Sequence, residues 1–191
     1  GLQHYALGRD IEIAVIDGER GLGNELCFPA GPLREPVSRL KEVDLVVVNG
    51  DRSRVSHLSS GPCMEMQLNP TRLVNIKTGS VETLESVKGK TVHAVVGISN
   101  PERFFSTLKK LGCTLVPHQY PDHHPFTAAD INFDDELPVI MTEKDAVKLD
   151  PLTLDDGCDQ FWYLEVEATF TSSELDRLLQ RLELSPVQSG A

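Results

Sequence analysis

The sequence contains 191 residues, of which 40% are hydrophobic and 25% are charged, as expected for one sizeable globular domain or two small ones. Its formal net charge of −11 argues against nucleic-acid binding and against direct electrostatic attraction to an anionic membrane, because both partners favour a basic surface. The four cysteines, at positions 27, 63, 113 and 158, form no CxxC pair and are predicted to be free thiols of a reducing compartment, and we expect neither a signal peptide nor a bilayer-spanning apolar run.

The first part of the chain predicts a βαβ unit. Residues 11–16 and 45–48 are apolar and rich in β-branched side chains, which is typical of strands buried on both faces of a parallel sheet. Between them, apolar residues recur at helical spacing from Leu33, so a helix is expected over residues 33–43. These elements favour two parallel strands joined by a right-handed helical crossover.

A connector and a hairpin are expected next. Residues 53–62 are polar and contain Ser and Gly, as connectors do. Two segments with alternating polarity, 64–68 and 73–76, flank Asn69-Pro70-Thr71. Alternation around a short turn predicts an antiparallel hairpin that is exposed on one face.

The sequence from about Ser80 onward predicts a second α/β unit. Its expected strands are four short apolar runs, at 91–96, 115–116, 139–141 and 161–166. Its expected helices are at 81–87 and 102–111, from Thr127, from Thr142 with an N-cap box, and from Ser172 or Ser173 to Leu184. The predicted fold class is therefore α/β, with mostly parallel sheets flanked by helices in two sub-domains. The expected domains are residues 1–60 and 80–191, with the hairpin as a linker or hinge at 61–79.

The loop that follows the predicted strand at 115–116 is the strongest candidate site. Its sequence, Pro121-Asp122-His123-His124-Pro125-Phe126, places two histidines after an acid and between two prolines. The prolines fix φ and disfavour helix at the preceding residues, so the loop is expected to be stiff and to present Asp122 and His123 at one point of the surface. In α/β proteins, sites form where strands end at their carboxyl edge. A surface turn with two solvated histidines is the alternative.

The chemistry that these residues favour is proton transfer. A histidine paired with an acid can remove the proton of a sugar hydroxyl that attacks phosphorus, because the proton affinity of imidazole lies near neutral pH. A metal site at Asp122, His123 and His124 is disfavoured because no further ligand occurs at a workable spacing, so we predict none.

The sequence contains no complete phosphate-binding loop. Gly89-Lys90-Thr91 matches the end of GxxxxGK[ST], but Leu84 occupies the position of the first glycine, and the tripeptide precedes a strand instead of following one. The loop with Gly21 and Gly23 does not complete GxGxxG, because Leu26 stands at its last position. The chain is therefore not expected to cradle nucleotide phosphates by itself.

Four unusual strings occur in a fixed order: Gly31-Pro-Leu-Arg-Glu-Pro36, Gly97-Ile-Ser-Asn-Pro-Glu-Arg-Phe-Phe105, Pro121-Asp-His-His-Pro-Phe126 and Met141-Thr-Glu-Lys-Asp-Ala-Val-Lys148. From Gly1 to about Leu184 the chain resembles tetraacyldisaccharide 4'-kinase, the lipid A 4'-kinase family of Gram-negative bacteria. The resemblance implies a P-loop kinase that uses ATP and Mg²⁺ to phosphorylate the 4'-hydroxyl of a glucosamine disaccharide lipid at the cytoplasmic face of the inner membrane.

The resemblance covers only the C-terminal part of that kinase. In the family, Gly-Leu-Gln-His follows a Walker-B-like pair of aspartates. The P-loop, these aspartates, the acid partner of the catalytic histidine and an N-terminal membrane-binding helix would therefore lie upstream of Gly1. The resemblance thus implies that ATP and Mg²⁺ are bound mainly by upstream residues, that the membrane surface is contacted through the upstream helix, and that the chain alone is inactive.

The resemblance also implies site residues. Asp122 and His123 match the active-site Asp-His pair, with His123 in the catalytic dyad, and Arg34 and Glu35 match a charged pair near the nucleotide. Four further residues lie in family strings without an assigned role: Asn100, Glu143, Lys144 and Asp145. A free-standing α/β binding or regulatory module without chemistry is the alternative function, and the oligomeric state is left open.

Overall fold

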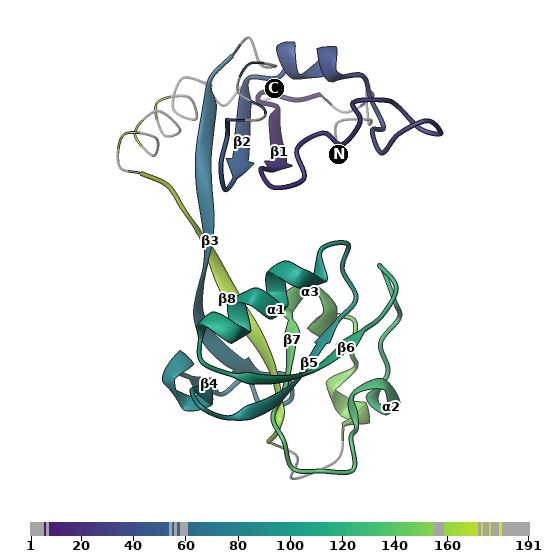
Figure 1. The fold of residues 1–191 in the computed structure, drawn as a ribbon, viewed down its shortest axis with the longest axis vertical. Helices are drawn as coiled ribbons and strands as arrows, with labels where there is room; N and C mark the ends of the chain where they lie inside the picture. The colour runs from purple at the N-terminus through teal and green to yellow at the C-terminus, as the bar shows by residue number, and fades with distance from the viewer. Residues whose placement is uncertain are drawn as a thin grey trace, which may run out of the picture. The chain divides into compact units, whose positions relative to one another are not determined.

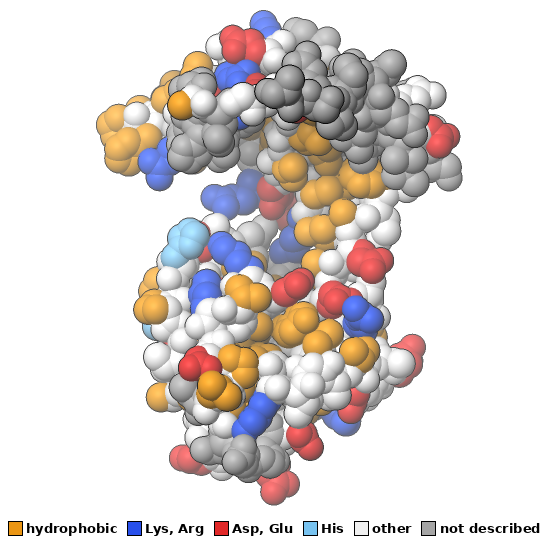
Figure 2. Space-filling view, turned by 180° about the vertical axis from the view of Figure 1, so that it is seen from behind, with side chains coloured by type: hydrophobic (Ala, Val, Ile, Leu, Met, Phe, Trp, Pro, Cys, Tyr) orange, Lys and Arg blue, Asp and Glu red, His pale blue; other side chains and the backbone are white. Residues whose placement is uncertain are grey.

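The structure is a computed structural model that describes residues 6, 8–53, 55, 57, 61–154, 159–171, 173, 176 and 180. The chain divides into two compact units, Gly1–Leu68 with Ala168–Ala191, and Asn69–Glu167 (Figure 1). Each unit has hydrophobic clusters of its own. On the face drawn in Figure 2, the acidic and basic side chains of the described residues are interspersed.

The first unit contains three parallel strands with a fully buried strand at their centre. Strand β2 (Leu45–Asn49) pairs with β1 (Ile13–Asp17) on one side and with the first residues of β3 (Cys63–Asn75) on the other. All five residues of β2 are buried, as its apolar run predicts. The predicted parallel pairing of the first two strands is therefore confirmed.

The second unit is also built on a mostly parallel sheet. Its strand order is β3-β8-β7-β5-β6, and β4 pairs with β3 in antiparallel orientation. The pairs β5–β6, β5–β7 and β7–β8 are all parallel, which confirms the predicted α/β class. The bounds of these strands are β4 Val81–Glu82, β5 Thr91–Val96, β6 Thr114–Gln119, β7 Val139–Thr142 and β8 Phe161–Thr169.

Helices and loops cover both faces of β5. Helix α1 (Pro101–Lys110) buries Phe104, Phe105 and Leu108 in the same hydrophobic cluster as alternate residues of β5. Val95 faces the second cluster, which includes Phe126 and Ile131. Other helical segments of the second unit are α2 Ala128–Ile131, α3 Glu143–Ala146 and the 3-10 turns η3 Leu84–Val87 and η4 Pro151–Thr153.

The predicted hairpin in the linker at 61–79 is wrong. Residues Cys63–Asn75 form the single strand β3, with Asn69-Pro70-Thr71 inside it. Alternating polarity is the same in a hairpin and in one long strand, and the φ of proline is compatible with extended backbone. The two ends of β3 have different neighbours, because Cys63–Met66 pairs with β2 and Leu73–Val74 pairs with β4.

Two predicted helices are shorter than expected. The helix predicted over 33–43 is reduced to the 3-10 helix η1 (Val37–Lys41), which begins directly after Pro36. This start has a local cause, since a proline disfavours helical φ and ψ at the residue before it. In the segment 81–87, Val81–Glu82 pairs with β3, so helical structure begins only at Leu84.

The C-terminal helix predicted from Ser172 or Ser173 to Leu184 lies mostly outside the described residues. Within this segment the structure describes Ser173, Asp176 and Gln180, and all of these are helical. The segment Ala168–Ala191 belongs to the first compact unit, whereas the sequence assigned it to the domain 80–191. Within the described residues, no helix has both the length and the apolar character that a membrane crossing needs.

Candidate active site

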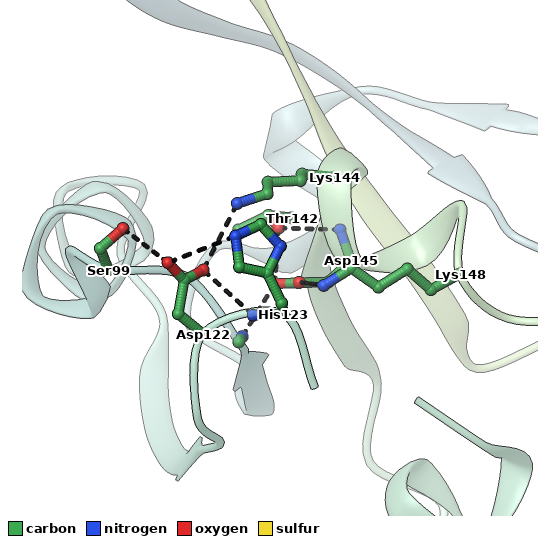
Figure 3. A network of polar contacts seen from close by, with 8 residues as sticks. Ser99, Asp122, His123, Thr142, Lys144, Asp145 and Lys148 are labelled. Carbon is green, nitrogen blue, oxygen red and sulfur yellow. Dashed lines mark hydrogen bonds and ion pairs between the residues drawn. The ribbon is translucent and has the colours of Figure 1, made fainter. Parts of the chain in front are cut away.

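The candidate site of the second unit lies where three neighbouring parallel strands end. Strand β5 leads into Gly97 and Ser99, β6 leads into Asp122 and His123, and β7 ends at Thr142, the N-cap of α3. Because the carboxyl ends of parallel strands share one edge of the sheet, these loops meet (Figure 3). The loop with Asp122 and His123 thus stands at the predicted position.

The Asp122 carboxylate is contacted by residues from all three loops. Its Oδ2 accepts a hydrogen bond from the Ser99 hydroxyl at 3.0 Å, and its Oδ1 lies 3.4 Å from Lys144 Nζ. The backbone N–H of His123 also donates to Oδ1, at 3.1 Å. Burial raises the pKa of Asp122, but the Ser99 hydrogen bond and the positive charges of Lys144 and His123 outweigh burial and hold this pKa below its ordinary value. The side chain therefore stays ionised at neutral pH.

His123 has an unusual backbone and an accessible ring. Its φ is +64°, a left-handed conformation that is uncommon for a residue with a side chain. The His123 N–H also donates to Gly97 O at 3.3 Å, which helps to hold this conformation. The side chain is 77% exposed, and its Nε2 lies 3.8 Å from Asp122 Oδ2, beyond hydrogen-bond range. The imidazole can therefore meet a ligand from solvent while the carboxylate stands beside it.

A buried carboxylate ties the loops together beneath this pair. The Asp145 side chain is fully buried, and its Oδ2 accepts hydrogen bonds from Gly97 N–H and the Thr142 hydroxyl, both at 2.8 Å. Its Oδ1 lies 2.7 Å from Lys148 Nζ, which balances the buried charge (Figure 3). Gly97 thus connects the two, because its N–H donates to Asp145 and its carbonyl oxygen accepts from the His123 N–H.

Gly97 is required at this junction because a side chain has no room there. A Cβ at this position would stand 2.9 Å from the Phe126 ring and 3.3 Å from Pro121 O. We expect Gly97→Ala to lower the free energy of unfolding by about 1–3 kcal/mol, because the ring and the loop must shift. Urea denaturation checks this value. Gly8→Ala is the matched control and should have little effect, because a Cβ at position 8 would have no atom within 4 Å. Gly50→Ala is unsuitable as a control, because the φ of +96° at Gly50 strains any residue with a side chain.

The neighbouring His124 lies in a different environment. Its ring packs against Tyr120 and Phe126, with centroid distances of 4.6 and 4.8 Å, and its Nε2 lies 3.4 Å from Asp130 Oδ1. The side chain is only 24% exposed. His124 therefore has the surroundings of a packing residue, whereas His123 faces solvent.

Arg34 and Glu35, the predicted nucleotide-binding pair, belong to the first unit. They line an open cavity of about 740 Å³ with apolar residues of β1 and η1. The Arg34 guanidinium lies 5.6 Å from the centroid of the Phe28 ring, and Glu35 Oε2 lies 3.3 Å from Arg39 Nε. An exposed cation beside a cavity suits an anionic ligand, so the pair stays a prediction for nucleotide binding.

Sequence reasoning gave no role to Ser99, Lys144, Asp145 and Lys148. The predicted helix start at Thr142 is confirmed, because Thr142 is the N-cap of α3 and its Oγ1 accepts a hydrogen bond from Asp145 N–H at 3.2 Å. A lysine three residues after that aspartate was the available signal for an ion pair. Among the described residues, no group of three or more His, Cys, Asp or Glu side chains is arranged to hold a metal ion.

Comparison with known proteins gives a family match over nearly the whole chain. Residues 1–183 match the model of the family described as LpxK, tetraacyldisaccharide-1-P 4'-kinase. A tetraacyldisaccharide 4'-kinase of Hahella chejuensis is 47% identical over 182 residues, which are 95% of this chain and 51% of that protein. One from Legionella pneumophila is 50% identical over 173 residues, or 91% of this chain and 50% of that protein. The chain thus spans about half the length of the curated relatives it matches.

A solved structure supports the fold. The "apo" form of LpxK from Aquifex aeolicus, crystallised in complex with ATP, matches with a TM-score of 0.69 and 23% sequence identity. The match covers 95% of this chain and 55% of that one. At this identity the likeness shows a shared α/β fold.

Proposed function

Because the chain belongs to the tetraacyldisaccharide-1-P 4'-kinase family, we propose that it is the part of a lipid kinase that carries the Asp122-His123 pair. The complete protein would transfer the γ-phosphate of ATP to the 4'-hydroxyl of a tetraacyldisaccharide 1-phosphate in lipid A biosynthesis. The single observation that carries this proposal is the solvent-facing His123 beside an ionised Asp122 at the carboxyl edge of three parallel strands.

The proposed role of His123 is to assist removal of the proton from the attacking hydroxyl. Its ring is exposed enough to touch a substrate, and imidazole can accept a proton near neutral pH. Asp122, whose Oδ2 lies 3.8 Å from His123 Nε2, would favour the protonated imidazole that forms. Gly97 and Asp145 fix the backbone that presents the ring. Their rigidity favours productive orientation, on which phosphoryl transfer depends.

ATP and Mg²⁺ are the proposed cosubstrate and metal. Arg34 offers a cation for nucleotide phosphate beside the cavity of the first unit, with Glu35 next to it. We propose that residues preceding this chain in the complete protein supply most of the protein ligands of the ion, since one or two carboxylates together with the nucleotide phosphates suffice to hold Mg²⁺. The ion would neutralise charge on the transferring phosphate when bound.

The proposed location is the cytoplasmic face of the inner membrane, with the protein attached peripherally. Support for this location comes from the disaccharide with four acyl chains in the family's name, because such a lipid resides in a membrane. A segment outside the matched region would contact the bilayer.

A paired kinase assay tests the function. We expect the complete protein to transfer labelled γ-phosphate to tetraacyldisaccharide 1-phosphate, and the 191-residue chain alone to show no transfer, because it contains no phosphate-binding loop in its sequence. The complete protein with the lysine of its phosphate-binding loop replaced is the negative control. Robust transfer by the chain alone would contradict the proposal. An inactive complete protein that still binds the lipid would favour a non-catalytic binding module.

A further inference from the structure

We propose that Lys144, assisted by Ser99, is a positioning residue that fixes the orientation and charge of the Asp122 carboxylate beside His123. The inference rests on the proposed kinase function, because Asp122 and His123 are its proposed proton-transfer pair. The Lys144 ammonium contacts the Asp122 carboxylate, so Lys144 would act on His123 through Asp122.

The contacts restrain both oxygens of the carboxylate. Oδ1 receives the His123 N–H at 3.1 Å and the Lys144 ammonium at 3.4 Å, while Oδ2 receives the Ser99 hydroxyl at 3.0 Å. Ser99 and Lys144 approach the carboxylate from different sides (Figure 3). Rotation about the bond to the carboxyl group would break these contacts together. Oδ2 is thereby kept toward His123, whose Nε2 lies 3.8 Å away.

Lys144 reaches Asp122 from a well-anchored backbone. It lies in α3, whose N-cap is Thr142. The buried Asp145 carboxylate accepts hydrogen bonds from the Thr142 hydroxyl and from the Gly97 N–H. Gly97 O in turn accepts from the His123 N–H. The backbones that carry Lys144, Ser99 and His123 are therefore tied to one another beneath the exposed side chains, so the ammonium is delivered to a fixed place.

Stability does not explain this ion pair well. The side chains of Lys144 and Asp122 are 51% and 36% exposed, and ion pairs this accessible contribute little to folding free energy because water screens them. The Lys144 ammonium instead holds the accessible Asp122 carboxylate in place beside His123. Preorganisation of the proton-transfer pair explains this arrangement better. The exposure of His123 leaves room for a substrate hydroxyl to enter beside the pair.

The kinetic test compares Lys144→Met, Lys144→Arg and Ser99→Ala in the complete protein. We expect Lys144→Met to lower kcat by about 10- to 100-fold with little change in either KM, because a loosened carboxylate misplaces the proton-transfer pair. Lys144→Arg should recover most of the rate because it keeps the charge, and Ser99→Ala should have a smaller effect in the same direction. Lys110→Met, which removes an exposed lysine at the end of α1, is the matched control and should leave kcat unchanged.

A second readout is independent of activity. The carboxyl carbon of Asp122, followed by NMR against pH in the complete protein, should titrate below the ordinary range of an aspartate. Its midpoint should rise in Lys144→Met and return in Lys144→Arg, and Lys110→Met should not move it. If the wild-type protein shows no kinase activity, the proposed function fails while this titration still tests the contact.

Two results would overturn the proposal. An unchanged kcat with a raised KM for ATP or lipid would show that Lys144 contacts an anionic ligand directly. An unchanged Asp122 titration in Lys144→Met would show that the ammonium does not act on the carboxylate in solution. Thermal unfolding of each variant verifies folding, and Ser99→Ala keeps the test open if Lys144→Met is poorly folded.

Discussion

Replacing His123 by Ala in the complete protein is expected to lower kcat by about 10²–10⁴-fold while KM changes far less. The imidazole would act on the hydroxyl proton as the bond to phosphorus forms, so its loss should raise the barrier without weakening substrate binding equally. The ring is largely exposed to solvent, so its removal leaves no cavity in the core and the variant should fold normally. Steady-state kinetics with varied ATP and varied lipid measure both constants.

His124→Ala is the matched control, because it removes the same side chain one residue further on. Its ring packs on Tyr120 and Phe126, so we expect a loss of thermal stability and only a small change in kcat. If His124→Ala destroyed activity and His123→Ala were mild, the catalytic histidine would have been chosen wrongly. If both variants were fully active, the loop would be the surface turn that the sequence also allowed.

The strands were predictable because their sequences allow few alternatives. The run at Leu45–Val48 is continuous and apolar, and Val92–Val96 is apolar except for His93. Burial on both faces of a parallel sheet is the environment that such runs fit. β3 was not predictable in the same way. Its alternating pattern fits a hairpin as well as one long strand, and only its different neighbours, β2 and β4, decide between them.

The site was predictable where the signal is local. Two prolines around Asp122 and His123 identify a stiff loop, and the preceding strand places it at the carboxyl edge. The function of Asp145 was not predictable, because its hydrogen-bond partner Gly97 is 48 residues away and belongs to another strand end. A local pattern explains Asp145 as part of a helix cap, and only tertiary structure shows that the carboxylate is buried.

Asp145→Ala is expected to lower the free energy of unfolding by about 3–5 kcal/mol, the largest effect that we expect on stability. The change leaves the partly buried Lys148 ammonium without its carboxylate and removes the acceptor of the Gly97 N–H. Asp145→Asn should be nearly as harmful, because an amide can accept hydrogen bonds on one side only, and donors approach both oxygens. Urea denaturation measures the loss.

The local consequence can be measured at Gly97. Its N–H donates to the buried carboxylate, so we expect slow amide hydrogen exchange in the wild-type protein and much faster exchange in Asp145→Ala. Asp134→Ala, at an aspartate outside this network, is the matched control and should change stability by no more than about 0.5 kcal/mol. If Asp145→Ala had the same free energy of unfolding as the wild type and the same exchange rate at Gly97, the buried carboxylate would not hold the strand-end loops together. A destabilised Asp145→Ala that retains full kcat would separate this anchoring of the fold from the presentation of His123.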